Sequence, residues 1–272
     1  MPSIDIEGQA PPILRTTGLL KRLCSPAHSV LIALSLTTPA WGQAPPPAPP
    51  LAPPRPELPA LPPTPTNQPS IQAAFSVLID AAHGGADSGA RIASQLLEKD
   101  LTLGFSVRLR SALAARGITV LTTRESDIVL PANQRAGIAN HTLASACLLI
   151  HATATGSGIH LFTSSLPPAS VPSAAVLPWQ TAQSGWITRS LRLSSEINSA
   201  LGQAGIPVTL GRAAVRPLDN LTCPAVAIEI APLAASPANQ ALPISDPKYQ
   251  QRILDALAAA LLEWSTDWRQ QP

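Results

Sequence analysis

This 272-residue chain has few aromatic residues and no large excess of positive or negative charge. Five Trp, three Phe and one Tyr make up only 3% of it, so aromatic platforms for stacking bases or sugars are not indicated. The net charge is +2 and no block of Lys or Arg occurs, which argues against a nucleic-acid partner. No apolar run reaches the roughly 18 residues that a membrane-spanning helix requires.

Cysteine is also rare, with three in the whole chain. Cys24 lies near the N-terminus, whereas Cys147 and Cys223 each precede an apolar segment. If those two segments form neighbouring strands, a disulfide between Cys147 and Cys223 is feasible, at a Cα separation of about 4.4 to 6.8 Å. Two buried free thiols are the alternative.

The N-terminus has the pattern of an export signal. A short apolar stretch at 29–36 is preceded by basic residues and followed by small residues near Gly42 and Ala44. The stretch is too short to cross a bilayer. We therefore expect residues 1–43 to be a signal peptide and the mature protein to act in the periplasm or outside the cell, without a stable transmembrane segment. An uncleaved membrane anchor is the alternative.

A proline-rich segment follows the signal. Of the 31 prolines in the chain, 13 fall between Pro45 and Pro69. Such a composition prevents regular helix and sheet and favours an extended, semi-rigid spacer. We expect residues 44–71 to be a linker, or a docking site for a proline-binding partner, and residues 72–268 to form the single folded domain.

Apolar strand-like segments alternate with helical patterns through this domain. This alternation predicts an α/β fold with an open, mixed and largely parallel sheet that has helices on both faces. The region 166–184 is rich in Pro, Ser and Ala and is expected to be irregular. Strands are expected at 76–80, 118–121, 147–150, 159–162 and 225–230, and helices after Asp100, from Pro131, at about 185–201 and from Pro247.

Three of the helices have recognisable ends or faces. Asp100 can cap a helix that runs to Gly117 with an apolar residue at every fourth position. The helix from Pro131 is expected to extend its apolar side as far as Leu143. Asp246 followed by Pro247 is a strong start signal for the last helix.

Polar residues follow the apolar strands at the points where a site can form. His83 and His151 stand at the carboxyl ends of two strands, and Glu229 lies near the end of a third. Glu98 sits at the start of a helix. Sites in open α/β sheets form beyond the carboxyl ends of the strands, and two imidazoles with one carboxylate can hold a tetrahedral zinc with one open position. Each histidine alone has an ordinary structural explanation, but an unpaired carboxylate inside an apolar strand is costly.

Several segments carry a resemblance to a known family. Residues 79–90, 97–100, 149–152 and 224–230 resemble the zinc-dependent N-acetylmuramoyl-L-alanine amidases, and the match spans roughly residues 75–265. The resemblance implies that His83, Glu98 and His151 bind Zn²⁺ and that Glu229 is the catalytic acid and base. It also implies peptidoglycan as the substrate, cleaved between N-acetylmuramic acid and L-alanine.

The segments around these residues depart from the family pattern. Ala81 and Ala82 stand where the family commonly has Pro and Gly, Thr153 stands where it usually has Asn, and Ile230-Ala231 replaces a Gly-Phe pair. Two alternatives therefore stay open. One is a catalytically inactive peptidoglycan-binding or regulatory module, and the other is a zinc hydrolase of a different exported amide. The need for a protein activator is also left open.

Other charged residues are candidates for a place near the site. We expect His160 to be a partly exposed strand residue, with a position facing the site as the alternative. Arg124 and Arg135 are expected to hold loops rather than to bind a substrate carboxylate. Arg212 and Arg216 precede the strand of Glu229, and of the two we take Arg216 as a substrate-binding candidate.

Overall fold

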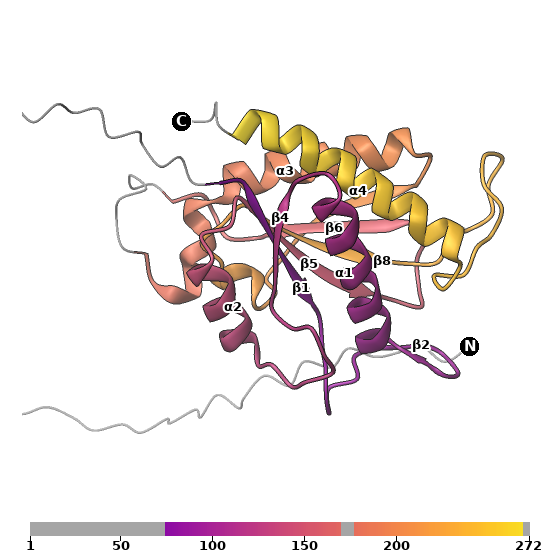
Figure 1. The fold of residues 1–272 in the computed structure, drawn as a ribbon, viewed down its shortest axis with the longest axis horizontal. Helices are drawn as coiled ribbons and strands as arrows, with labels where there is room; N and C mark the ends of the chain where they lie inside the picture. The colour runs from indigo at the N-terminus through magenta and orange to yellow at the C-terminus, as the bar shows by residue number, and fades with distance from the viewer. Residues whose placement is uncertain (1–73, 170–176, 269–272) are drawn as a thin grey trace, which may run out of the picture. The chain divides into compact units, whose positions relative to one another are not determined.

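A computed structural model describes residues 74–169 and 177–268. The expected signal peptide, the whole of the expected linker, and residues 170–176 of the irregular region 166–184 lie outside the described residues. Residues 74–268 are built on a six-stranded sheet (Figure 1). Its strands are, in spatial order, β4 (Thr119–Thr122), β1 (Ser76–Ala81), β5 (Ala146–Ala152), β8 (Ala225–Ile230), β6 (Ile159–Ser164) and β7 (Val208–Ala213).

The sheet is mixed and mostly parallel, as predicted. β4, β1, β5 and β8 run parallel to one another, whereas β6 pairs antiparallel with β8 and parallel with β7. Because β1, β5 and β8 are adjacent and parallel, their carboxyl ends meet at one edge of the sheet. A separate two-stranded hairpin is formed by β2 (Arg91–Ala93) and β3 (Leu96–Leu97).

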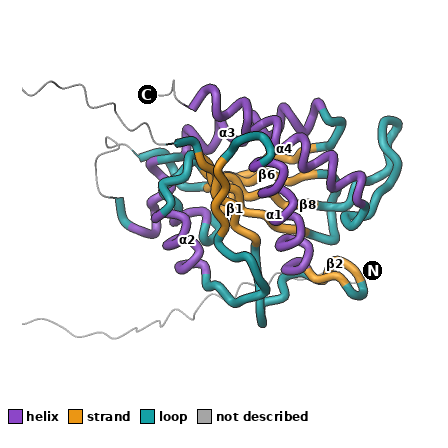
Figure 2. The backbone as a smooth tube through the Cα atoms, viewed as in Figure 1, coloured by secondary structure: helices purple, strands orange, loops and turns teal. Residues whose placement is uncertain are grey.

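Helices cover both faces of the sheet (Figure 2). α1 (Glu98–Ala114), α3 (Ile187–Gln203) and α4 (Pro247–Asp267) pack on one face in the larger apolar core. α2 (Ala132–His141) and the short 3₁₀ helix η2 (Leu218–Asn220) cover the other face in a smaller core. A second 3₁₀ helix, η1 (Trp179–Gly185), contacts η2.

Strand β5 shows why the sheet is buried on both sides. Leu148 and Ile150 belong to the larger core, whereas Cys147 and Leu149 belong to the smaller one, and all four are fully buried. Alternate side chains of a strand point to opposite faces. A strand between two helical layers is therefore apolar at every position, which is the pattern that made the parallel strands visible in the sequence.

The first helix begins earlier than the sequence predicts. α1 starts at Glu98, and Asp100 lies within its first turn rather than at its cap. No side chain caps this helix. Instead, the N–H groups of Glu98 and Lys99 donate to the carbonyls of Ala90 and Ser88. Backbone from the preceding loop thus satisfies groups that a capping side chain would otherwise satisfy.

The second helix ends earlier than predicted. α2 ends at His141, and Leu143 is 81% exposed with φ of +50°. Both the N–H and the Oγ1 of Thr142 donate to the carbonyl of Ala139. This closing turn redirects the chain, so the prediction that Leu143 extends the buried face is wrong.

The predicted start of the last helix is confirmed. The Asp246 carboxylate accepts hydrogen bonds from the N–H groups of Lys248 and Tyr249, at 2.9 and 2.8 Å. Pro247 is the first helical residue. One side of this helix is apolar, and five of its residues are buried to 1% exposure or less, namely Tyr249, Ile253, Leu257, Leu261 and Trp264.

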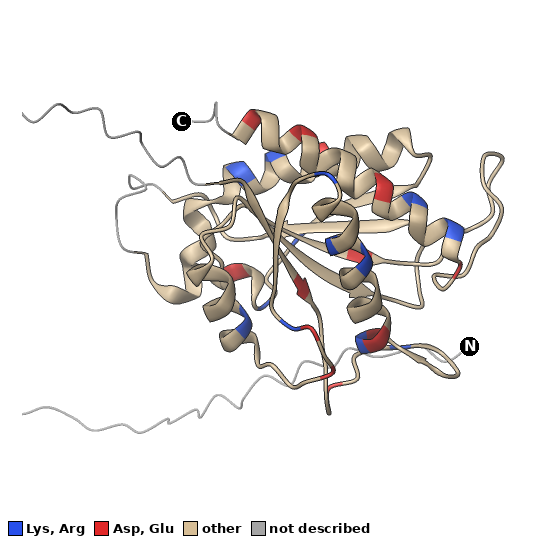
Figure 3. Cartoon of the chain, viewed as in Figure 1, with Lys and Arg blue, Asp and Glu red and all other residues tan. Residues whose placement is uncertain are grey.

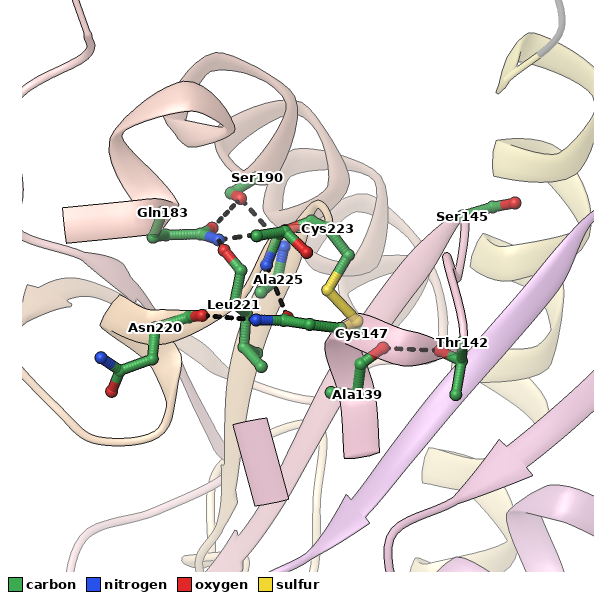
Figure 4. The surroundings of a disulfide bond; sticks show 12 residues. Ala139, Thr142, Ser145, Cys147, Gln183, Ser190, Asn220, Leu221, Cys223 and Ala225 are labelled. Atoms are coloured by element: carbon green, nitrogen blue, oxygen red, sulfur yellow. Dashed lines mark hydrogen bonds between the residues drawn. A yellow bond between two sulfur atoms is a disulfide. The ribbon is translucent and has the colours of Figure 1, made fainter. Parts of the chain in front are cut away.

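Cys147 and Cys223 form a disulfide, so the first of the two sequence alternatives is correct (Figure 4). Their Cα atoms are 6.1 Å apart. The Gln183 side chain donates to the carbonyls of Leu221 and Cys223, and the Ser190 hydroxyl donates to Gln183. These contacts anchor the segment that leads into β8.

Acidic and basic residues both occur along the helices in the view of Figure 3, which agrees with the small net charge. Within residues 74–169 and 177–268, no helix combines the length and the apolar character that crossing a membrane requires.

Candidate metal centre

The three predicted ligands come together at the carboxyl edge of the sheet. His83 follows β1, His151 lies near the end of β5, and Glu98 is the first residue of α1. One nitrogen or oxygen from each lies within 4.8 Å of the others. His83 Nε2 is 3.1 Å from Glu98 Oε2, and His151 Nδ1 is 3.1 Å from Glu98 Oε1. The two imidazole rings are almost perpendicular, with centroids 5.6 Å apart.

The carboxylate of Glu98 is buried and held on both oxygens. The N–H of Ala90 donates to Oε2 at 2.9 Å, and the N–H of Ala152 donates to Oε1 at 3.1 Å. Burial disfavours the charged form, but the hydrogen bonds with His151 and His83 and those two N–H groups outweigh it. Together they hold the pKa of Glu98 well below its usual range. Glu98 is therefore ionised, as a metal ligand must be.

Asp87 orients the first imidazole. Both oxygens of its carboxylate lie 2.9 Å from Nδ1 of His83, which leaves Nε2 directed at Glu98. The hydrogen bond with Glu98 raises the pKa of His83; burial opposes the rise and Asp87 adds to it. A carboxylate on the far nitrogen of a ligating histidine fixes the ring and strengthens it as a donor. Sequence reasoning missed this role, although an acid four residues after His83 in a glycine-rich turn was a usable signal.

The ligand group also depends on a glycine. Gly89 has φ of +62°, and a Cβ added there would lie 2.6 Å from both Glu98 Oε2 and His83 Cδ2. No other residue type fits a position where backbone approaches two side chains so closely. His83 itself has φ of +61°, which is uncommon for a residue with a Cβ. The turn that presents His83 is thus set by tight local geometry.

Glu229 lies beside the ligand group rather than within it. It is on β8 in register with His151 on β5, and its side chain is 32% exposed. Its Oε2 is 2.7 Å from Nδ1 of His160 on β6. His160 is a partly exposed strand residue, as expected, at 18% exposure, and its side chain is also bonded to the predicted catalytic residue.

A pocket of about 210 Å³ opens beside the two ligand histidines. One wall is apolar and comes from the loop before α2, at Val129 and Leu130. Arg216 lines the same pocket, is exposed, and makes no hydrogen bond or ion pair with any described residue. Arg212 does not line it, because its guanidinium donates to the carbonyls of Ser164 and Leu166.

The loop-holding role predicted for the two buried arginines is confirmed. Arg135 donates to the Asp80 carboxylate at 2.7 Å and to the carbonyl of His83 at 2.5 Å. Arg124 donates to the carbonyls of Ala81 and Ala82, both at 2.9 Å. These bonds fasten the backbone before His83, where the sequence lacks the Pro and Gly of the family pattern.

The donor set fits a zinc ion. Two imidazole nitrogens and one carboxylate oxygen are the three protein ligands of many catalytic zinc sites, which keep a fourth position for water or substrate. The Asp87–His83 contact supplies the outer support that such sites use. Among the described residues this is the one group of His, Cys, Asp and Glu close enough to share an ion.

Several characterised proteins are similar to this chain. The model of the N-acetylmuramoyl-L-alanine amidase family matches residues 77–263. The germination-specific N-acetylmuramoyl-L-alanine amidase of Bacillus subtilis is 27% identical over 212 residues, which cover 70% of this chain and 80% of that protein. The amidase AmiC of Escherichia coli is 30% identical over 130 residues, which cover 47% of this chain and 30% of that protein.

Solved structures share the fold. The amidase Ami1 of Mycobacterium smegmatis superposes with a TM-score of 0.56 at 20% identity, over 71% of this chain and 97% of that one. An N-acetylmuramoyl-L-alanine amidase of Clostridium difficile 630 gives a TM-score of 0.53 at 23% identity, over 70% and 96% of the two chains.

Proposed function

Because the chain belongs to the N-acetylmuramoyl-L-alanine amidase family, we propose that it is a zinc-dependent hydrolase that cleaves peptidoglycan between N-acetylmuramic acid and L-alanine. The observation that carries the proposal is the convergence of His83, Glu98 and His151 at the carboxyl edge of the sheet. A module that only bound cell wall would not require an ionised, buried carboxylate between two histidines.

His83, Glu98 and His151 would hold the ion. When bound, zinc lowers the pKa of a coordinated water to about 7 and polarises the scissile carbonyl. Glu229, one strand away from His151, accepts the proton of the attacking water and returns it to the departing alanine nitrogen. A positioned acid and base of this kind contributes about 10² to 10⁴ in rate.

The zinc and the role of Glu229 can be tested together. We expect the purified protein to contain one zinc and to release peptides that begin with L-alanine from cell-wall fragments, and we expect a chelator to abolish this release. Glu229→Gln keeps the shape but cannot take a proton, so turnover should fall by about 10² or more while zinc is retained. Metal analysis measures the zinc content, and mass spectrometry of the products measures the release of peptides.

Glu263→Gln provides the matched control, because Glu263 is an exposed residue of α4. It should behave as the wild type. Full activity of Glu229→Gln would remove Glu229 from the mechanism. A protein that binds zinc and cell wall but releases no peptide would instead be the binding module, and release of other products would indicate a different amide as substrate.

The substrate-binding role of Arg216 is part of this proposal. Its guanidinium has no partner among the described residues, and Arg216 lines a pocket that Val129 and Leu130 also line. A substrate peptide carries methyl groups and free carboxylates, which suit these apolar side chains and the guanidinium. A hydrogen-bonded charge pair with a substrate carboxylate should mainly strengthen binding.

For Arg216→Ala we expect KM to rise about tenfold, in line with the loss of one hydrogen bond to a charged group, with kcat within about twofold of the wild type. Steady-state kinetics on a soluble muropeptide measure this. Arg192→Ala removes another exposed arginine, on α3, and should change neither constant. An unaltered KM in Arg216→Ala would exclude the carboxylate contact.

We also propose that the protein reaches its substrate by export. Support comes from the signal-like pattern of residues 1–43 and from the location of peptidoglycan outside the cytoplasm. Under this proposal, residues 44–71 are the proline-rich linker that precedes the catalytic domain in the exported protein.

A further inference from the structure

Three polar side chains lie in register across neighbouring strands next to the metal centre. On β8, Glu229 pairs in register with His151 of β5 on one side and with His160 of β6 on the other. Side chains directly across adjacent strands point to the same face of a sheet. Their chain neighbours belong to the larger core on the opposite face, namely Ile150, Ile228, Ile230, Ile159 and Leu161.

The contact between Glu229 and His160 is short and well supported. His160 Nδ1 is 2.7 Å from Glu229 Oε2, which is typical of a hydrogen bond to a carboxylate. The His160 ring lies against the backbone of Gly156, where an added Cβ would come within 2.5 Å of Cε1. Gly156 belongs to the loop between β5 and β6. The hydrogen bond to Glu229 and the contact with Gly156 therefore both restrict the orientation of the His160 ring.

We infer that His160 is a positioning residue for Glu229 and that it acts on the reaction through this carboxylate. The inference rests on the proposed function. A glutamate has three rotatable side-chain bonds and two equivalent oxygens, so without a partner it samples many orientations. The bond to His160 occupies Oε2 and leaves Oε1 as the oxygen that exchanges protons with water and the leaving nitrogen.

This role differs from that of the other histidines. His83 and His151 both contact Glu98 and belong to the ligand group. His141 ends α2 and bonds to the carbonyl of Gly137 on its own helix. Reacting groups must be held within about half an ångström of the productive geometry, usually by contacts from a second layer of residues. Among the described side chains, His160 is the one that hydrogen-bonds to Glu229.

A pair of substitutions separates positioning from packing. His160→Asn keeps a nitrogen donor close to the place of Nδ1, whereas His160→Leu keeps the bulk and removes the donor. We expect kcat of His160→Leu to fall about 10- to 100-fold, the usual cost of losing an outer contact to a catalytic group. KM and zinc content should stay within twofold. His160→Asn should retain kcat within about threefold to fivefold of the wild type.

The control is His141→Leu, which removes a histidine that contacts neither Glu229 nor the ligand group and should leave kcat unchanged. Two results would overturn the inference. One is a wild-type kcat in His160→Leu. The other is an equal loss of kcat in His160→Asn and His160→Leu, which would mean that the ring shape matters and the donor does not.

A second measurement does not depend on activity. Imidazole NMR of the wild type should show a downfield Nδ1 proton for His160, and Glu229→Gln should shift or remove it. An unchanged resonance in Glu229→Gln would overturn the pairing. If the wild type released no peptide while this resonance responded as expected, the proposed function would fail and the pairing would stand, so the two failures are distinguishable.

Discussion

At the level of single residues, the site consists of ligands and of residues that hold them. His83, Glu98 and His151 would supply the donor atoms of the proposed zinc site, whereas Asp87 contacts the His83 ring and Gly89 leaves room for it. Glu98 is held by its two histidines and by two backbone N–H groups. These contacts hold the three side chains in place before an ion binds. Ion binding therefore costs little side-chain conformational entropy, and we expect the affinity for the ion to be correspondingly high.

The contribution of Asp87 can be measured directly. Asp87→Asn replaces the carboxylate on His83 Nδ1 by a neutral amide, which weakens the bond that orients the ring. We expect zinc affinity to fall about 10- to 100-fold, as is typical when an outer carboxylate is lost. Competition against a chromophoric chelator measures this affinity at a fixed pH.

Asp100→Asn is the matched control for that experiment. Asp100 is an exposed acid in the first turn of α1, two residues from Glu98, and it contacts none of the ligands. Each variant therefore loses one negative charge, and the two positions lie in the same region of the chain. Equal losses of affinity would mean that charge near the site, rather than the contact with His83, governs zinc binding.

The grouping of His83, Glu98 and His151 was predictable from sequence, whereas the partner of Glu229 was not. A histidine that ends an apolar strand is visible because the strand pattern and the residue type coincide, as at His83 and His151. The pairing of His160 with Glu229 depends on β6 lying antiparallel beside β8, and no local pattern reveals which strands are neighbours. Arg216 was a candidate from sequence, but the pocket that it lines is formed by segments distant in the chain, which no local pattern shows.

At the level of elements, prediction succeeded where the local chemistry is self-contained. α4 has an Asp cap, a Pro at its first position and a continuous apolar stripe, and β8 is apolar at every position except Glu229. α1 was placed three residues late, with the cap at Asp100 instead of Leu97, because its first N–H groups bond to carbonyls of a loop, which no capping residue signals. β7 was missed because it is an edge strand with exposed and half-buried residues and no clear alternation.

The order of the elements explains how the site is assembled. β1, β5 and β8 are neighbours in the sheet although more than 140 residues separate Glu229 from His83 in the chain. Parallel strands joined by helices bring their carboxyl ends to one edge, so each strand can present one functional side chain there. Glu98, the first residue of α1, adds a carboxylate at the same edge.

At the level of the whole molecule, the disulfide and the metal centre lie at opposite ends of the same strands. Cys147 precedes His151 by four residues on β5 and Cys223 precedes Glu229 by six, so at about 3.3 Å per residue the disulfide lies more than 10 Å from the site. The bond joins segments 76 residues apart in the sequence. It should therefore act on the unfolded chain far more than on the chemistry.

For the double variant Cys147→Ala/Cys223→Ala we expect the free energy of unfolding to fall by roughly 2 to 4 kcal/mol, because the unfolded chain gains the freedom that the cross-link removes. Zinc content and kcat at 25 °C should stay close to those of the wild type. Urea unfolding with and without a reductant provides the measurement and its control together. The wild-type midpoint should drop when the reductant is present, whereas the midpoint of the double variant should not move. If the reductant leaves the wild-type midpoint unchanged, the two cysteines are free thiols and the predicted stabilisation is wrong. If the double variant loses zinc, the disulfide end of these strands is coupled to the metal site.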